Sequence, residues 1–216
     1  MITVSAFKWV PQFAQGQVRD LRVRWALEEA GLPYCEMLIG GADKNSAAYR
    51  ALQPFGQVPA IEEDGLTLFE SGAIILYIGA KSEALLPKDE EARARAVTWV
   101  FAALNTMEVV IQPYGELSAF YANEEWAKLR KPGLEKQLKL RLSELATQLG
   151  TREYLEDRFT AGDLMMASVL RILDGSGVLD TQPALEAYKE RCIARPAFQR
   201  ALAAQLAAFE KHKPAA

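Results

Sequence analysis

The fold is decided by two short segments, Gln57-Val58-Pro59-Ala60-Ile61 and Leu68-Phe69-Glu70-Ser71-Gly72. Between them, Asp64-Gly65 is a strong hairpin signal, so we expect the flanking apolar runs to pair as antiparallel strands. Pro59 has no amide donor, which predicts a sheet edge or a turn at Val58-Pro59. A cis bond there would direct the Val58 amide and carbonyl outward, and such an outward pair can bind an extended peptide as an added strand.

The second segment places Glu70 and Ser71 at the junction between a strand and a helix. A helix N-terminus offers free amides and a partial positive charge to a carboxylate, and the Ser71 hydroxyl adds a donor. Glu70 beside it can hold an ammonium group. Together these groups predict a receptor for a ligand with an α-amino-acid head and a peptide body. For an isolated Glu-Ser pair the alternative is structural, with Ser71 as an N-cap and Glu70 as a solvated charge.

Working outward, residues 1–80 are expected to form an α/β domain with a mixed sheet in the order βαβαββα. The expected strands are 2–7, 34–39, 58–61 and 66–69, and the expected helices are 18–30, 46–52 and 71–78. Residues 81–91 are polar around Pro87 and are expected to be a linker. Residues 92–216 show no strand-like alternation and are expected to form an all-α domain, with helices near 92–111, 132–149, 164–172, 185–193 and 196–210.

The composition excludes several classes of function. The 28 acidic and 25 basic side chains give a formal charge of −3, which argues against a nucleic-acid-binding surface. One histidine, His212, and two cysteines, Cys35 and Cys192, cannot build a structural zinc site or a disulfide framework. Cys35 is expected to be buried in the second strand. No apolar run approaches the roughly 18 residues that span a bilayer, and no charged leader precedes the first strand, so a cytoplasmic location without membrane partners is expected.

The motifs of this chain resemble those of the cytosolic glutathione transferase superfamily, and the chain is similar to bacterial members of it. The resemblance covers almost the whole chain and rests on residues 25–34, 54–59, 68–71, 159–163 and 195–198. It implies a thioredoxin-like N-terminal domain, a helical C-terminal domain and a homodimer. It also implies that Val58 bonds the cysteinyl backbone of glutathione beside a cis Pro59. Glu70 and Ser71 would hold the γ-glutamyl end, and Gln57 would line the same groove.

The family pattern fails in the loop from Lys8 to Arg19, which lacks the Ser, Tyr or Cys that members usually aim at the glutathione sulfur. A free thiol has a pKa of about 8.5, and lowering it by about two units requires roughly 2.7 kcal/mol. A helix N-terminus contributes about 0.3–1 kcal/mol and a charged hydrogen bond about 1.5–3 kcal/mol, so together they suffice. Arg19 is the candidate donor and Gln17 the neutral alternative. The other interpretation of Arg19 is a solvated arginine on the helix face, and Ser5 is expected to be structural.

The function that this resemblance implies is conjugation of the glutathione thiolate to small apolar electrophiles, as in detoxification, with glutathione as co-substrate and no metal. Plausible walls of the electrophile pocket are Trp9, Phe13, Met107 and Tyr114, each of which could instead belong to the core. Two alternatives stay open: a glutathione-dependent peroxidase in the same site, and a non-catalytic glutathione-binding or interaction module. Thiol–disulfide exchange is disfavoured because the loop has no cysteine. The resemblance also implies that Thr160 and Asp163 form a buried capping box.

Overall fold

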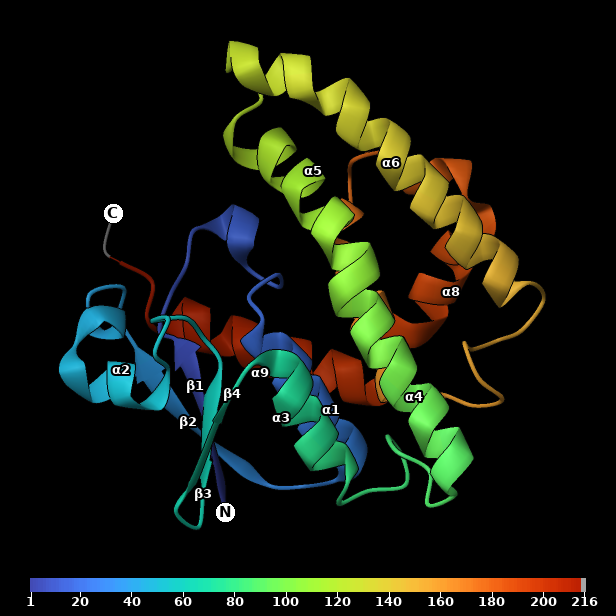
Figure 1. Ribbon diagram of the computed structural model, residues 1–216. Helices are drawn as coiled ribbons and strands as arrows, with labels where there is room; N and C mark the ends of the chain where they lie inside the picture. Colours follow the sequence, from blue (N-terminus) through green and yellow to red (C-terminus); the bar gives the residue numbers. More distant parts are fainter. Residues whose placement is uncertain (215–216) are drawn as a thin grey trace. The chain divides into compact units, whose positions relative to one another are not determined.

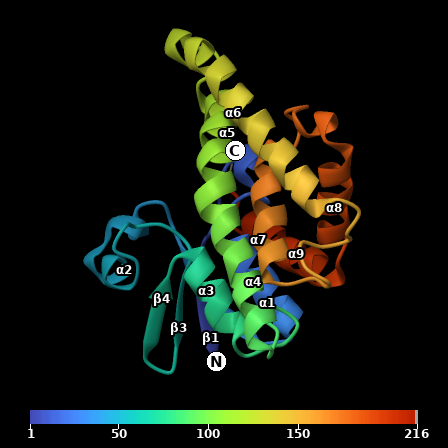
Figure 2. The ribbon, with the colours of Figure 1, turned by 45° about the vertical axis from the view of Figure 1, so that its right-hand side comes forward.

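The computed structural model describes residues 1–214, which form two compact units. The first unit combines Met1–Leu86 with the chain from Arg195 onward, and the second comprises Pro87–Ala194. Figure 1 labels most of the helices and strands of both units, and Figure 2 also labels α7. The first unit is α/β with a mixed sheet and the second is helical, as the sequence predicted.

The first unit is built on a four-stranded sheet in the order β2-β1-β3-β4. Strand β1 pairs in parallel with β2 and antiparallel with β3, and β3 pairs antiparallel with β4. The elements are β1 (Ile2–Phe7), α1 (Asp20–Ala30), β2 (Tyr34–Ile39), α2 (Ala47–Leu52), β3 (Ala60–Glu63), β4 (Leu66–Phe69) and α3 (Ser71–Gly79), with 3-10 turns η1 (Gln12–Ala14) and η2 (Asp43–Asn45). The predicted βαβαββα order is confirmed. Strand β3 begins after the expected residue 58, because Pro59 has no amide to place in the ladder.

Helices cover both faces of this sheet. Helices α1 and α3 pack together on one face, and α2 lies on the other (Figures 1 and 2). The core of this unit contains apolar side chains with almost no exposed surface, among them Val4, Val23, Trp25, Ile61 and Ile74. The α2 side has a smaller core of Ile39, Tyr49 and Val58, against which Phe7, Val18, Met37 and Leu52 pack.

The last helix, α9 (Pro196–Lys211), belongs to the first unit and packs on α1. The sequence analysis had grouped it with the helical domain at 92–216. An amphipathic stripe shows that a helix has a buried face, but it does not identify the surface that covers this face. Here the covering surface is α1, where the ring of Phe198 meets that of Trp25 edge-on at a centroid distance of 4.8 Å.

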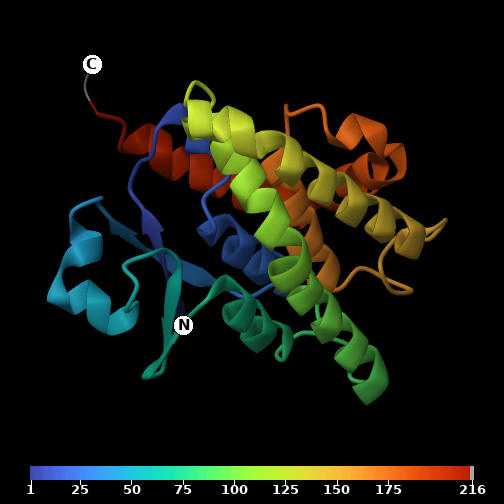
Figure 3. The same ribbon diagram turned by 45° about the horizontal axis from the view of Figure 1, so that its top comes forward.

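The second unit contains α4 (Glu90–Ala102), a π-helical segment η3 (Ala103–Glu108), α5 (Val109–Phe120), α6 (Glu125–Leu149), α7 (Ala161–Leu170), η4 (Arg171–Leu173), η5 (Leu179–Thr181) and α8 (Pro183–Ile193). Helix α6 runs beside α5, and α7 packs against α4 (Figure 3). Two expected boundaries were wrong, since the helix predicted at 92–111 continues to Phe120 and the helix predicted at 132–149 begins at Glu125. Pro132 therefore lies inside a helix, on its exposed side, where water can satisfy the carbonyl left without a donor.

The continuous helix from Glu90 to Phe120 is long and apolar enough, by length and composition alone, to cross a membrane. Its most apolar 18-residue window has a mean hydropathy of 1.3 and is 33% buried. From the sequence no such stretch is expected, because no apolar run approaches about 18 residues. The helix packs against α6 and α7 within its unit, and core helices of soluble proteins meet the same two criteria, so these criteria do not make it a membrane span.

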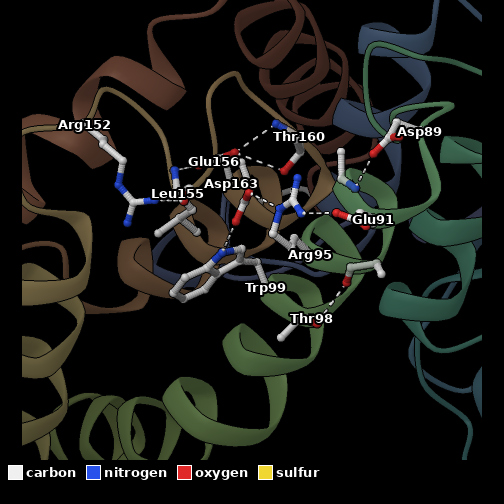
Figure 4. Close-up of polar contacts among 12 residues, drawn as sticks. Asp89, Glu91, Arg95, Thr98, Trp99, Arg152, Leu155, Glu156, Thr160 and Asp163 are labelled. Carbon is white, nitrogen blue, oxygen red and sulfur yellow. Dashed lines mark hydrogen bonds and ion pairs between the residues drawn. The ribbon is translucent and has the colours of Figure 1, made fainter.

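A buried hydrogen-bond cluster organises the start of α7 (Figure 4). The Asp163 carboxylate accepts from the Thr160 amide at 2.9 Å and from the Leu155 amide at 2.8 Å. The Tyr188 hydroxyl of α8 donates to the same carboxylate at 2.9 Å. Burial raises the pKa of Asp163, and these donors lower it in return. The expected capping box of Thr160 and Asp163 is confirmed, and it joins α7, α8 and the preceding loop.

Gly162, inside this capping box, allows α7 to approach α4 closely. A Cβ atom at this position would lie 2.5 Å from the Trp99 Cβ and 3.2 Å from the Ala96 carbonyl oxygen. Trp99 itself is fixed by a 2.9 Å bond from its ring Nε1 to Glu156 (Figure 4). The sequence Thr160-Ala161-Gly162-Asp163 therefore combines a cap with a contact that no side chain can replace.

Asp163→Ala is expected to lower the free energy of unfolding by about 2–5 kcal/mol, because each buried donor left without an acceptor costs about 1–3 kcal/mol. Urea denaturation followed by circular dichroism measures this loss. The matched control is Asp157→Ala, which removes an exposed carboxylate from the same loop. Equal unfolding midpoints for the two variants would contradict the proposed role of the cluster.

Candidate functional site

The hairpin of β3 and β4 brings the two segments that decide the fold to one end of the sheet. Ala60 pairs with Phe69, so Val58-Pro59 and Glu70-Ser71 extend from adjacent ends of the paired strands. The Val58-Pro59 bond is cis, as predicted. In the described part of the chain, neither the amide nor the carbonyl of Val58 has a hydrogen-bond partner. The predicted outward donor–acceptor pair is therefore present beside the start of α3.

A chain of buried hydroxyl groups holds this segment in place. The Ala60 amide donates to the Ser5 Oγ at 2.7 Å, the Ser5 Oγ lies 2.8 Å from the Tyr49 hydroxyl, and that hydroxyl donates to the Gln57 carbonyl at 2.6 Å. Because a carbonyl can only accept, Tyr49 gives its proton to Gln57 and receives the proton of Ser5. Side chains from β1 and α2 thus satisfy the main chain on both sides of Val58-Pro59, which confirms a structural role for Ser5.

Glu70 has an unusual backbone conformation directly before α3. Its φ of 68° lies in the left-handed region, where a residue other than glycine costs about 1–3 kcal/mol. The Glu70 side chain is exposed and makes no capping bond to α3, while its carbonyl accepts from the Ile74 amide at 3.0 Å. The first-turn amides of α3 therefore have no side-chain cap. Such amides, with the partial positive charge of the helix end, form a site suited to a carboxylate.

Arg22 places a positive charge at the same point, which the sequence analysis missed. It is only 5% exposed, and its Nη1 lies 3.4 Å from the Oγ of the buried Ser71. The available signal was the alternation of three charged residues with apolar ones at the start of α1. These residues are Asp20, Arg22 and Arg24. Charged groups on a helix that is otherwise buried indicate a structural pair or a ligand site.

The loop that precedes α1 contains the other predicted residues of the first unit. Arg19 is half-buried and is the N-cap residue of α1, whereas Gln17 is exposed. Trp9 is half-buried and Phe13, in η1, is 64% exposed. Met107 and Tyr114 lie in the second unit and are each only 4% exposed. The electrophile pocket and the roles of Arg19 and Gln17 stay predictions.

The two cysteines differ in environment. Cys192 is buried in α8, but Cys35 is exposed on β2, so the prediction that Cys35 is buried was wrong. Strand β2 is an edge strand whose Cys35 and Glu36 are both exposed, and alternation along the strand did not reveal this. Among residues 1–214, no group of three or more His, Cys, Asp or Glu side chains could hold a metal ion.

Known proteins similar to this chain share one family. The model of the glutathione S-transferase N-terminal domain matches residues 21–81. A glutathione S-transferase of Hyoscyamus muticus is 31% identical over 205 residues, which cover 84% of this chain and 92% of that protein. Glutathione S-transferase 1 of Zea mays is 31% identical over 193 residues, which cover 84% and 90%. A Burkholderia graminis glutathione transferase, solved with two glutathione molecules per subunit, superposes with a TM-score of 0.81 at 26% identity, covering 93% of this chain and 87% of that one.

Tyr49→Phe is expected to lower the free energy of unfolding by about 1–3 kcal/mol, because the Gln57 carbonyl loses its donor inside the fold. Chemical denaturation measures the change. Tyr77→Phe is the matched control, since it removes a hydroxyl from the same unit that bonds Glu63 near the surface at 2.7 Å. A loss for Tyr49→Phe no larger than that for Tyr77→Phe would show that the hydroxyl chain does not hold this segment.

Proposed function

This chain belongs to the glutathione S-transferase family, and from that premise we propose that it binds glutathione and joins the glutathione sulfur to small apolar electrophiles. The observation that carries the proposal is the unpaired Val58 main chain beside the uncapped start of α3. In the described part of the chain, these groups offer a peptide donor and acceptor next to a carboxylate site. Glutathione carries the complementary groups in the same order, a γ-glutamyl head followed by a cysteinyl amide and carbonyl.

In the proposed complex the cysteinyl main chain of glutathione bonds to Val58, as an added strand would. The γ-glutamyl carboxylate accepts from the first amides of α3 and from the Ser71 hydroxyl, with the charge of Arg22 behind it. The exposed Glu70 carboxylate holds the ammonium group. Gln57, exposed beside Val58, lines the same groove. Each polar group of the ligand head then has a protein partner of opposite character.

The reaction requires a glutathione thiolate. Its sulfur lone pair forms the new carbon–sulfur bond while the leaving group of the electrophile departs with the electron pair of the broken bond. We propose Arg19 as the charged donor that stabilises the thiolate, with the N-terminus of α1 as a second contribution. Trp9 and Phe13 offer apolar surface from the same loop to the electrophile.

A non-catalytic glutathione-binding or interaction module is the second candidate, because the loop from Lys8 to Arg19 has no Ser, Tyr or Cys to activate a thiol. Reduction of organic hydroperoxides in the same site is a third. Turnover with an aryl halide supports conjugation, turnover with cumene hydroperoxide supports the peroxidase, and binding without either supports the module. An absence of glutathione binding would rule out both the conjugation and the peroxidase, and would leave an interaction module.

We further propose that the protein is a cytoplasmic homodimer and that it comes from a bacterium. The exposed apolar side chains Phe55, Phe101 and Val109, exposed by 64%, 51% and 58%, support contact with a second copy. Neighbours from Burkholderia graminis and Pseudomonas fluorescens, at 26% and 25% identity, support a bacterial origin.

Ser71→Ala is expected to weaken glutathione binding by about 10- to 150-fold, because one hydrogen bond to a charged carboxylate contributes about 1.5–3 kcal/mol. Isothermal titration calorimetry of glutathione measures the change. Ser143→Ala, at an exposed position of α6, is the control and should bind as the wild type does. Unchanged affinity in Ser71→Ala would place the γ-glutamyl end elsewhere.

Arg19→Ala is expected to raise the pKa of the bound glutathione thiol by about one to two units, because a charged donor to the thiolate is lost. The thiolate absorbance measured against pH reports this value directly. Gln17→Ala is the comparison variant. A rise in Gln17→Ala with none in Arg19→Ala would transfer the role to the neutral side chain.

A further inference from the structure

The C-terminal helix α9 is joined to α1 by three polar contacts of different character. Arg195 forms a two-pronged pair with Glu29 at 2.6 and 2.8 Å, and Arg200 bonds Glu28 at 2.6 Å, both near the C-terminal end of α1. The third contact is made by Gln205, which has no exposed surface and reaches the opposite end of α1. This third contact lies where the loop from Lys8 to Arg19 enters the helix.

The Gln205 amide holds two groups on either side of Arg19. Its Nε2 donates to the Val18 carbonyl at 3.2 Å and to the Asp20 carboxylate Oδ1 at 2.8 Å. Both partners are acceptors when Asp20 is ionised, so only the NH₂ group of the side chain can face them. In the described part of the chain, the Gln205 Oε1 has no partner. The orientation of the amide is thus determined entirely by Val18 and Asp20.

Asp20 is itself fixed from two directions. Its Oδ2 accepts from Arg24 Nε at 2.7 Å, and its Oδ1 accepts from Gln205. Burial raises the pKa of Asp20, and the bonds from Arg24 and Gln205 oppose that rise. Asp20 is the first residue of α1 and follows the N-cap residue Arg19 directly. Beside these two side-chain donors, the carboxylate also accepts from the Asp20 amide, the first amide of α1.

We propose that Gln205 is a positioning residue for the glutathione sulfur: from α9 it holds the backbone of residues 18–20 through the Val18 carbonyl and the Asp20 carboxylate. The proposal rests on the proposed function, because it assumes that the sulfur lies at this helix end. The loop offers no hydroxyl, so stabilisation of the thiolate depends on the direction of the amides and of Arg19. Both directions follow from the backbone that Gln205 holds.

The test uses Gln205→Met, which keeps the length of the side chain and removes the donor. The pKa of the bound glutathione thiol is expected to rise by about half to one unit, since one helix-end interaction is weakened. Affinity for S-methylglutathione, which has no thiol to ionise, should stay within about twofold of wild type because the peptide-binding groups are untouched. Gln205→Asn, which is one methylene shorter, should shift the pKa of the bound thiol in the same direction. This second variant keeps the test available if the methionine variant does not fold.

The matched control is Phe198→Leu, which weakens the packing of α9 on Trp25 without touching residues 18–20. A thiol pKa that moves in the Gln205 variants and not in Phe198→Leu supports the proposal. An unchanged thiol pKa in the Gln205 variants, or an equal shift in Phe198→Leu, would overturn it. If the wild type binds no glutathione, the proposed function and this inference both fail. If the Gln205 variants bind glutathione normally and the pKa of the bound thiol is unchanged, the inference alone is overturned.

Discussion

The hydrogen-bond chain from Ala60 through Ser5 and Tyr49 to Gln57 is the constraint on which the first unit depends. Pro59 interrupts the strand ladder, and an interrupted ladder in a fold interior leaves main-chain groups that must find partners. Two side-chain hydroxyls supply these partners, and bonds in series polarise one another in a low-dielectric interior. The sheet, α2 and the hairpin are positioned together by this arrangement. Its consequence is that the main chain of one residue, Val58, is left available to a ligand.

Helix α1 carries an unusual amount of buried charge for a helix that packs on both sides. Asp20 and Arg24 pair at 2.7 Å with no exposed surface, and Arg24 also pairs with Glu36 of β2. Buried pairs add little net stability, because desolvation offsets most of their Coulombic attraction. What they do supply is a defined position for the helix relative to β2 and α9. Arg22 lies between Asp20 and Arg24 in the sequence of the same helix. From there it presents its charge to Ser71 at the start of α3.

The sequence predicted the order of strands and helices because each element in the first unit has its own local signal. The β-branched and apolar runs, the turn residues and the Asp64-Gly65 pair are short-range features, and the structure confirms the order of elements that they predict. The two errors in the first unit arose where the outcome depends on distant contacts. The exposure of Cys35 follows from the edge position of β2, and the placement of α9 follows from the surface of α1. Neither is encoded in a window of a few residues.

The candidate site shows the same division between local and distant information. Val58, Glu70 and Ser71 could be predicted because their chemistry is carried by a motif within one hairpin. Arg22 could not be assigned, since its contact with Ser71 spans 49 positions and depends on how α1 and α3 pack. The available signal for Arg22 was the presence of charged residues among the apolar residues of α1.

The return of α9 to the first unit has a consequence for how the chain is made. The bond between Asp20 and Gln205 joins residues separated by 185 positions, and the whole helical unit lies between them. During synthesis from the N-terminus, the sheet and α1 leave the ribosome long before their covering helix exists. Until then, the apolar surface around Trp25 and the Asp20 carboxylate lack their α9 partners. The second unit can complete its own core first, so the first unit, which contains the candidate site, is expected to be the last part to reach its native packing.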